Sequence, residues 1–274
     1  MTTHFSSGVT NVKGKENATS LFSGIKQPLI TGATAPAEFA YQNDFQTYNA
    51  SDWQTVTSTG ASDYQLADYA FGWLRQGDGA PAAGEIQGVA DYECFQYSST
   101  RKWYFETRLA LTDVGEGNIW VGFAQNGYVD SDTLPTDGIG FSHLQDTTTI
   151  QFVSRKNGAG VSFDMLDSAG GSTYTFEDSS IATQSATVLA VPSNPVRLGF
   201  LFQPIGSAPG VTAVQFQLFL DGKSVGTQAA TTVPDDLEIG INAMIEHKGT
   251  TGNDLNIDYI QTVQSRIAGT GVSA

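Results

Sequence analysis

The clearest structural signal in this chain lies in residues 214–226, which read Val214-Gln215-Phe216-Gln217-Leu218-Phe219-Leu220-Asp221-Gly222-Lys223-Ser224-Val225-Gly226. Apolar residues occupy every second position from Val214 to Leu220, so they would line one face of a pleated strand. Asp221-Gly222 supplies the two positive-φ residues that a tight hairpin turn needs. The stretch therefore predicts a strand, a two-residue turn and a return strand.

The same alternation recurs along much of the chain. The predicted strands are Phe39 to Phe45, Trp53 to Val56, Trp103 to Leu111, Ile119 to Phe123, Ile139 to Ser142, Ile150 to Phe152, Val161 to Met165, Tyr174 to Phe176, Val196 to Phe202, Leu237 to Ile245 and Leu255 to Val263. Turn-forming residues separate these runs, and no window has helical spacing with caps. The pattern predicts an all-β fold with two antiparallel sheets packed as a jelly-roll sandwich.

Within the last strand, Leu255, Ile257, Tyr259 and Val263 share one parity, which predicts that all four face the same way. Between the runs, Gly84, Gly88 and other glycines indicate loops. We expect Gln76 to Ala90 and Gly206 to Gly210 to be loop embellishments of the sandwich.

The chain divides into three parts. Residues 1–37 form a polar leader without a sustained hydrophobic period, which is typical of a disordered segment or of an extended arm that orders on a partner. Its isolated apolar residues favour the extended N-terminal arm. Residues 38–267 form the sandwich, and residues 268–274 form a flexible tail. The contacts expected from the arm are its scattered apolar residues, Phe5, Val9, Val12, Leu21, Phe22, Ile25, Leu29 and Ile30.

Composition and charge exclude several classes of function. With 28 acidic and 13 basic residues, the 274-residue chain has a formal net charge of −15, which would repel nucleic-acid phosphates. No segment approaches the ~20 apolar residues of a membrane span, and no secretory signal is visible. The single cysteine, Cys94, is interpreted as a core residue rather than a nucleophile. His4, His143 and His247 are too few for a zinc site, and no cofactor is expected.

The sequence also lacks the paired carboxylates of a glycosidase. A sandwich glycosidase holds two carboxylates ~5 to 9.5 Å apart, which acids two or four positions apart on one strand would supply. Here Glu106 is followed on its face by Arg108, Glu238 by Asn242 and Glu246, and Asn256 precedes Asp258. These residues are interpreted as solvent-facing strand positions. The sequence predicts a protein that is not an enzyme and has no catalytic residues.

Two binding alternatives stay open. Asp130, Asp132 and Asp137 place three acids in one loop, which could hold calcium or simply form a polar turn. Because the full calcium-loop pattern is missing, no metal ligand is assigned. Trp120 lies on the opposite parity to Ile119 and Val121, so it is the candidate for an exposed aromatic that stacks on a sugar. Burial on both faces of a central strand is the alternative interpretation.

Four segments of the sequence resemble segments of known protein families. The hairpin Phe219 to Thr227 resembles those of concanavalin A-like and laminin G-like jelly rolls. Three further pieces are the start His4 to Val12, the loop Val233 to Leu237, and the ending Ile257-Asp258-Tyr259-Ile260 before Ser265-Arg266. Together with the hairpin they resemble the capsid decoration (cement) proteins of tailed bacteriophages.

This resemblance implies a structural role in a virion. The protein would be assembled in the host cytoplasm onto the outer capsid surface, which it would decorate or cement. Its partners would be the major capsid protein and neighbouring copies of itself, contacted through the arm and the jelly roll. The alternative is a carbohydrate-binding or host-adhesion module on the virion, with a glycan as its partner. Neither interpretation involves nucleic acid or a membrane.

Overall fold

The computed structural model describes residues 38–43, 45, 53–57, 65–67, 73–78, 83–90, 95–98, 101–126, 128, 133–180, 192–204, 214–229, 232–249 and 253–265. The eight predicted arm contacts, Cys94 and the tail lie outside these residues. The arm and its contacts therefore stay predictions.

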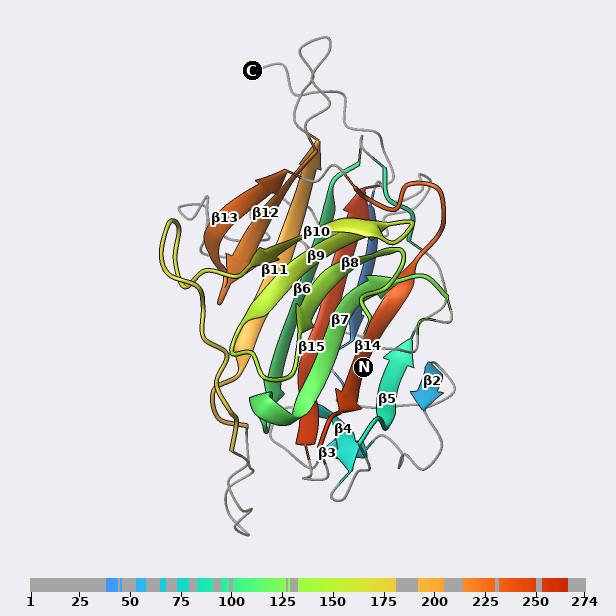
Figure 1. Ribbon diagram of the computed structural model, residues 1–274. Coiled ribbons are helices and arrows are strands. Elements are labelled where there is room, and N and C mark those ends of the chain that lie inside the picture. The colour runs from blue at the N-terminus through green and yellow to red at the C-terminus, as the bar shows by residue number, and fades with distance from the viewer. Residues whose placement is uncertain are drawn as a thin grey trace, which may run out of the picture.

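Fifteen described strands form two antiparallel sheets that pack face to face (Figure 1). Sheet A has the order β13 (Lys223–Ala229), β12 (Val214–Leu220), β11 (Val196–Pro204), β6 (Trp103–Leu111), β15 (Asn253–Ser265), β4 (Trp73–Asp78) and β3 (Gln65–Ala67), and β1 (Glu38–Asn43) pairs with β15 beside β4. Sheet B has the order β10 (Ala159–Asp164), β9 (Ile150–Lys156), β8 (Gly138–His143), β7 (Gly117–Ala124), β14 (Gly240–His247), β5 (Ile86–Ala90) and β2 (Gln54–Thr57). Figure 1 shows sheet B in front of sheet A.

The predicted fold class is confirmed. Both sheets are antiparallel throughout, and the described residues contain no α-helix, only the 3₁₀ turn η3 (Val114–Glu116). The strand Trp103–Leu111 has the bounds that its alternation predicts. Alternation succeeds there because the inward residues of β6 meet the other sheet, whereas the outward residues do not.

The core between the sheets is built around phenylalanine rings. Phe105, Phe123 and Phe141 project from sheets A and B onto Phe200, and all four side chains are fully buried. The ring centroids of Phe105 and Phe200 lie 5.5 Å apart, and those of Phe123 and Phe200 lie 6.4 Å apart, which is within the range of favourable aromatic packing. The sandwich is therefore closed by rings that interdigitate from both inner faces.

The predicted hairpin turn is also confirmed. Asp221 has φ 49° and Gly222 has φ 76°, the pair of positive values expected of this turn. The turn is fastened to β11, because the Asp221 backbone N–H donates to the Arg197 carbonyl at 2.7 Å and the Arg197 N–H donates to the Asp221 carboxylate at 3.0 Å. A side chain at Gly222 would meet the Arg197 guanidinium, with Cβ 2.3 Å from Nη2.

Two predictions about the segments between strands are wrong. The expected loop Gln76 to Ala90 contains the end of β4 and all of β5, and Gly88 lies inside β5. Alternation of apolar residues missed β4 because the buried inward position after Leu74 is the polar Gln76. Conversely, Tyr174 to Phe176 forms no strand; there, Thr175 makes only an isolated bridge to Thr149.

Candidate functional site

A bulge in β15 organises the outer face of sheet A. The register against β6 shifts between Ile257 and Tyr259, so Asp258 is the extra residue. Leu255 and Ile257 point into the core, and after the bulge Ile260 does so as well. Tyr259 and Val263 are turned to the outer face, which corrects the prediction that they share a face with Leu255. Bulges commonly re-aim side chains in this way.

The re-aimed Tyr259 meets Glu106, the outward residue at the centre of β6. The Tyr259 hydroxyl donates to Glu106 Oε1 at 2.6 Å, and Gln261 Nε2 donates to the same oxygen at 3.0 Å. Within the described part of the chain, no hydrogen bond reaches Oε2. Glu106 is only 3% exposed. Glu106 faces outward as predicted, but the prediction that it is exposed to solvent is wrong.

Burial controls the protonation chemistry of this pair. Desolvation raises the pKa of Glu106 above its ordinary value, and the hydrogen bonds from Tyr259 and Gln261 and the charge of Arg197 oppose that shift without cancelling it. Burial likewise raises the pKa of Tyr259, and the Glu106 carboxylate raises it further. Tyr259 is thus held in its neutral form as a hydrogen-bond donor.

Three arginines point to the outer face of sheet A, and each has an acidic neighbour. Arg108 Nη1 lies 2.9 Å from Asp258 Oδ2, and Arg75 Nη2 lies 2.8 Å from Asp254 Oδ2. The Arg108 guanidinium also stacks over Trp73, with 5.4 Å from Cζ to the ring centroid. Arg197 is the charge that acts on Glu106. The Asp221 carboxylate also accepts the Arg197 N–H at 3.0 Å, so four carboxylates lie beside these three arginines.

Arg197 and Arg108 lie directly opposite each other on β11 and β6. Like charges in such a pair repel. The two guanidiniums relieve the repulsion by reaching apart, Arg197 to the Asp221 carbonyl at 2.6 Å and Arg108 to Asp258. They consequently do not converge on a common point, and these two arginines form no clamp for an anion.

An apolar patch borders the polar network on the same face. Tyr104, Leu201 and Phe219 pack together with Val263 from the far end of β15. Phe219, Gly199, Glu106 and Gln261 are cross-strand neighbours on β12, β11, β6 and β15. Gly199 is the member of this row that has no side chain. The apolar patch therefore draws one residue each from β15, β6, β11 and β12, beside the polar network on the same face.

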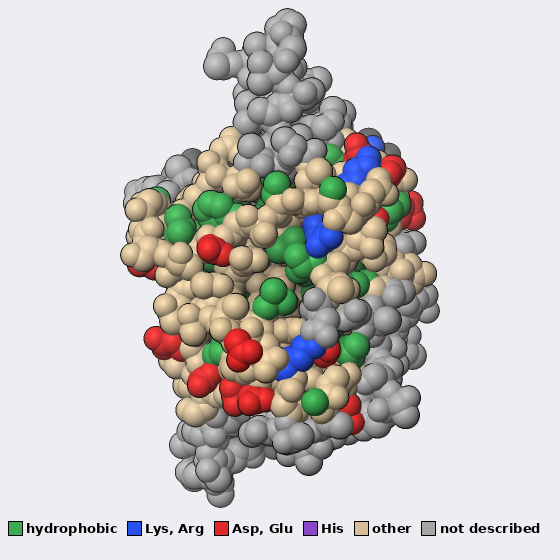
Figure 2. Space-filling model, in the orientation of Figure 1, with side chains coloured by type: hydrophobic (Ala, Val, Ile, Leu, Met, Phe, Trp, Pro, Cys, Tyr) green, Lys and Arg blue, Asp and Glu red, His purple; other side chains and the backbone are tan. Residues whose placement is uncertain are grey.

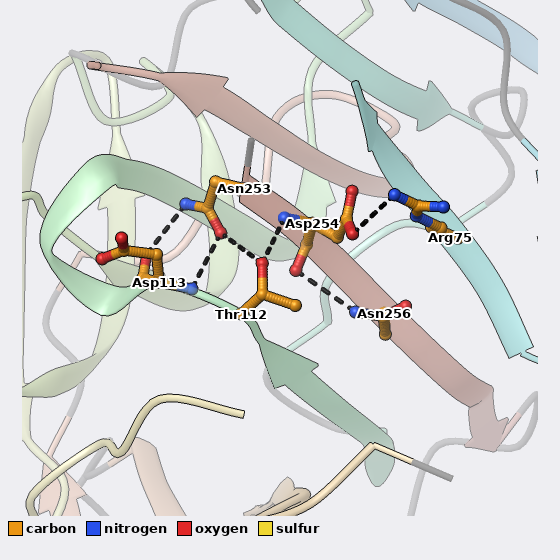
Figure 3. A network of polar contacts seen from close by, with 6 residues as sticks. All are labelled: Arg75, Thr112, Asp113, Asn253, Asp254 and Asn256. Atoms are coloured by element: carbon orange, nitrogen blue, oxygen red, sulfur yellow. Dashed lines mark hydrogen bonds and ion pairs between the residues drawn. The ribbon is translucent and has the colours of Figure 1, made fainter. Parts of the chain in front are cut away.

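A second polar network, at the end of β15, is structural. Figure 3 shows the Asn253 side chain between Thr112 and Asp113. Asn253 Oδ1 accepts from Thr112 Oγ1 and from the Asp113 N–H, both at 3.1 Å, and Nδ2 donates to the Asp113 carbonyl at 2.9 Å. Its hydrogen-bonding capacity is used in holding the loop before η3, and the side chain is fully buried.

His143 is likewise a packing residue. Nε2 lies 2.8 Å from the Val114 carbonyl and Nδ1 lies 2.9 Å from the Thr149 carbonyl. The ring is 1% exposed and meets Phe176 edge-on. It joins η3 to the turn after β8. His247 is fully buried at the end of β14, whereas His4 lies outside the described residues.

Trp120 is not an exposed sugar platform. Its side chain is fully buried on the outer face of sheet B, where it meets Tyr128 edge-on with ring centroids 6.0 Å apart. The ring passes over Gly140: a Cβ at that glycine would lie 3.1 Å from Trp120 Cζ2. The alternative interpretation, a tryptophan buried on the second face of a central strand, is correct.

The other acidic residues that the sequence singled out lie in different environments. Asp130 and Asp132 lie outside the described residues, and Asp137 accepts the Asn157 N–H at 2.8 Å and so holds the β9–β10 turn. No group of three metal-ligating side chains occurs where the structure describes the chain. Glu238 is exposed as predicted, but Glu246 and Asn256 are buried, contrary to their interpretation as solvent-facing residues.

Sequence reasoning missed the contact between Glu106 and Tyr259. One signal was present: Ile260 follows Ile257 by three positions, an odd spacing that breaks strict alternation and indicates an inserted residue.

No helix in the described residues is long and apolar enough to span a membrane.

Comparison with known proteins identifies the fold. The chain is similar to the Emp47p carbohydrate recognition domain (TM-score 0.54, 13% identity, 84% of this chain and 98% of that one). It is also similar to the metal-free Emp46p carbohydrate recognition domain (TM-score 0.50, 11% identity, covering 80% and 93%). A third similar structure is SO2946 of Shewanella oneidensis MR-1, a protein of unknown function (TM-score 0.52, 13% identity, covering 89% and 92%).

No protein-family model matches the sequence, and no curated protein matches it. At these low identities the similar structures establish a concanavalin A-like jelly-roll sandwich and no more. None of them points to capsid decoration.

Proposed function

We propose that this protein is a carbohydrate-binding module without catalytic activity, and that it binds a neutral sugar on the outer face of sheet A around Glu106. The observation that carries the proposal is the state of Glu106: a carboxylate held at Oε1 by Tyr259 and Gln261, with Oε2 left without a partner among the described residues. Oε2 is not sealed from solvent, so the hydroxyl of a ligand can donate to it.

The surrounding groups favour a sugar over other ligands. Tyr259 and Gln261 are partly exposed, so a ligand can reach them, and the ring of Tyr259 offers an apolar surface beside its polar hydroxyl. Each of the three arginines already has a carboxylate beside it, which favours an uncharged ligand that exchanges hydrogen bonds. Amide, phenol and carboxylate groups suit a polyol.

The fold adds support of a more general kind. The similar structures of Emp46p and Emp47p are described as carbohydrate recognition domains. Sandwiches of this fold also serve other purposes, so the likeness supports glycan binding only together with the Glu106 network.

The test is a glycan array followed by titration calorimetry with the best neutral glycan. We expect binding by the full chain, a loss of at least tenfold in affinity for Glu106→Ala, and a smaller loss for Tyr259→Phe. Glu238→Gln, which neutralises an exposed acid on another part of the surface, is the matched control. The proposal fails if no glycan is retained, or if Glu106→Ala binds as well as the control.

Capsid decoration is the second candidate. It is favoured by the resemblance of the two chain ends and the hairpin to phage decoration proteins, and by the net charge of −15, which suits the outside of a DNA-filled shell better than its inside. The partners would be the major capsid protein and neighbouring copies, with Phe5 to Ile30 as the arm that contacts the shell.

A deletion of residues 1–36 tests this second candidate. Capsid occupancy, measured on purified particles, should fall sharply if the arm binds the shell. Electron microscopy of intact particles would place the protein on the head or elsewhere. Unchanged occupancy after the deletion would remove the arm from the proposal, and absence of the protein from particles would remove the role itself.

A further inference from the structure

The apolar patch lies on the face of sheet A that points away from sheet B. Tyr104, Leu201 and Phe219 come from β6, β11 and β12, and Val263 of β15 packs against them. Leu201, Tyr104 and Val263 are cross-strand neighbours in one row, and Phe219 stands in the next row, which also contains Glu106. The patch is therefore a continuous apolar surface across four strands.

The patch is less exposed than its place on the outside of a sheet accounts for. Tyr104, Leu201 and Phe219 are only 6%, 5% and 3% exposed. All fifteen described strands belong to the two sheets, so none of them crosses this face, and the described residues of the patch all come from sheet A. Neighbours in one sheet shield a side chain from its sides and not from above. The low exposure therefore points to a cover that is none of the described strands.

The N-terminal arm, residues 1–37, joins the described part of the chain beside the patch. Its attachment point is Glu38 of β1, which pairs with Ser265, two positions after Val263. From β1 to β12 the face spans four strand spacings, or roughly 19 Å, a distance that about six extended residues cover. The arm is therefore long enough to cross the whole patch.

The composition of the arm complements this face. The charged residues of the arm are Lys13, Lys15, Lys26 and Glu16, so it carries a net +2 in a chain of −15, which leaves −17 on the rest. Beside the patch, Glu106 forms no ion pair within the described residues, so this face offers a carboxylate to a lysine. The arm also has eight apolar residues and no hydrophobic period with which to build a core of its own.

Two other segments outside the described residues begin at the same end of sheet A. They are residues 205–213, between β11 and β12, and residues 266–274, after β15. Each has nine residues, and their large aliphatic side chains are one isoleucine and one valine apiece. Neither has an acid-complementing cluster of lysines. The arm is therefore the occupant that length, apolar content and charge favour.

We propose that the N-terminal arm folds back over the outer face of sheet A of its own chain and covers the apolar patch with its apolar residues. The covalent tether gives the arm a high effective concentration at this face, and the opposite net charges favour the contact. An arm from a second copy is disfavoured, because two strongly acidic bodies repel each other. The proposal concerns the patch and not the hydrogen bonds of Glu106, so it stands whether or not a glycan binds there.

Thiol labelling at the patch tests the proposal on the full-length chain. In a Cys94→Ser background, Val263→Cys places a probe of similar size at a half-buried position of the patch. We expect slow reaction with N-ethylmaleimide when the arm is intact, and reaction at least tenfold faster when its eight apolar residues are changed to serine. The residues to be changed are Phe5, Val9, Val12, Leu21, Phe22, Ile25, Leu29 and Ile30.

Matched controls separate the arm from the other segments. A second probe, Ser162→Cys, is exposed on β10 and should react at the same rate with either arm. Changing the isoleucine and valine of residues 205–213 to serine, or those of residues 266–274, should leave the rate at Val263→Cys unchanged. The proposal is overturned if the serine arm leaves that rate unchanged or if either control raises it as much. Protection that disappears on dilution also overturns it, since the arm would then come from a second copy.

Discussion

Glu106 is a carboxyl group that folding removes from water without placing a cation in direct contact with it. Two neutral donors hold one of its oxygens, and Arg197 acts only through its field. A group in this position destabilises the folded state whenever it is ionised, because its folded-state pKa is raised. Such a cost is typical of sites where binding matters more than stability.

Replacing Glu106 by glutamine should therefore stabilise the protein. An amide oxygen can still accept from Tyr259, whereas the ionisation is removed. We expect Glu106→Gln to raise the free energy of unfolding near pH 7, because the variant lacks the ionised form that burial disfavours. The gain should shrink as the pH falls through the raised pKa toward ordinary glutamate values, since the native side chain then becomes neutral as well.

Urea unfolding of both proteins at a series of pH values measures this difference. Glu238→Gln is the control, and as an exposed substitution it should change stability by less than about 0.5 kcal/mol. A destabilised Glu106→Gln, or a gain that does not vary with pH, would contradict the role assigned to burial.

Gly122 and Gly226 are strand glycines with opposite tolerance for a side chain. A Cβ at Gly122 would lie 2.4 Å from Gly140 Cα and 2.5 Å from the Ile139 carbonyl oxygen, both backbone atoms that cannot move aside. A Cβ at Gly226 has no neighbour closer than 3.5 Å. We expect Gly122→Ala to destabilise the fold by about 2 to 3 kcal/mol, the cost of overpacking, and Gly226→Ala to cost little. Equal melting temperatures for the two variants would contradict this reading of the β7–β8 contact.

Among the elements, β15 has the largest influence on the site. Its first part pairs with β4 and its last part with β1, while β6 runs along its other side. The bulge at Asp258 lets one strand serve both faces: Ile257 and Ile260 fill the core, and Tyr259 turns outward. Strict alternation assigns Tyr259 to the wrong face because it counts residues and does not allow for an extra one.

The start of β15 also holds η3, and Asn253 is the residue that does so. Asn253→Asp keeps the oxygen that accepts from Thr112 but loses the amide donor to the Asp113 carbonyl, and it buries a charge. We expect a loss of about 3 kcal/mol in the free energy of unfolding. Gln96→Glu, which also turns an amide into an acid but at an exposed position, is the control and should be nearly neutral. If both variants unfold at the same urea concentration, the Asn253 network does not hold this end of the sandwich.

The whole molecule carries its acidic excess unevenly. The formal net charge is −15, and each arginine on the outer face of sheet A has a carboxylate beside it. The front view in Figure 2 shows acidic side chains gathered toward the lower part of sheet B, with few basic ones among them. The candidate binding face thus combines arginines with carboxylates on a strongly acidic protein.

Self-repulsion should make stability depend on salt. Raising the ionic strength from about 0.01 M to about 0.15 M shortens the Debye length from ~30 Å to ~8 Å and screens the repulsion. We expect the melting temperature at pH 7 to rise with sodium chloride over this range. Near the isoelectric point of about 4.3 the rise should disappear. A melting temperature that falls with salt at pH 7 would show that attractive ion pairs dominate instead.

Alternation and turn chemistry are properties of neighbouring residues, so the sandwich, most of its strands and the Asp221-Gly222 hairpin follow from the chain alone. The candidate site does not, because Glu106 and Tyr259 are 153 positions apart and meet only when β6 and β15 pair with a bulge between them. The same holds for burial. Trp120, Asn256 and Glu246 face outward by parity, but their exposure depends on what the rest of the chain lays over them, and only the tertiary structure decides that.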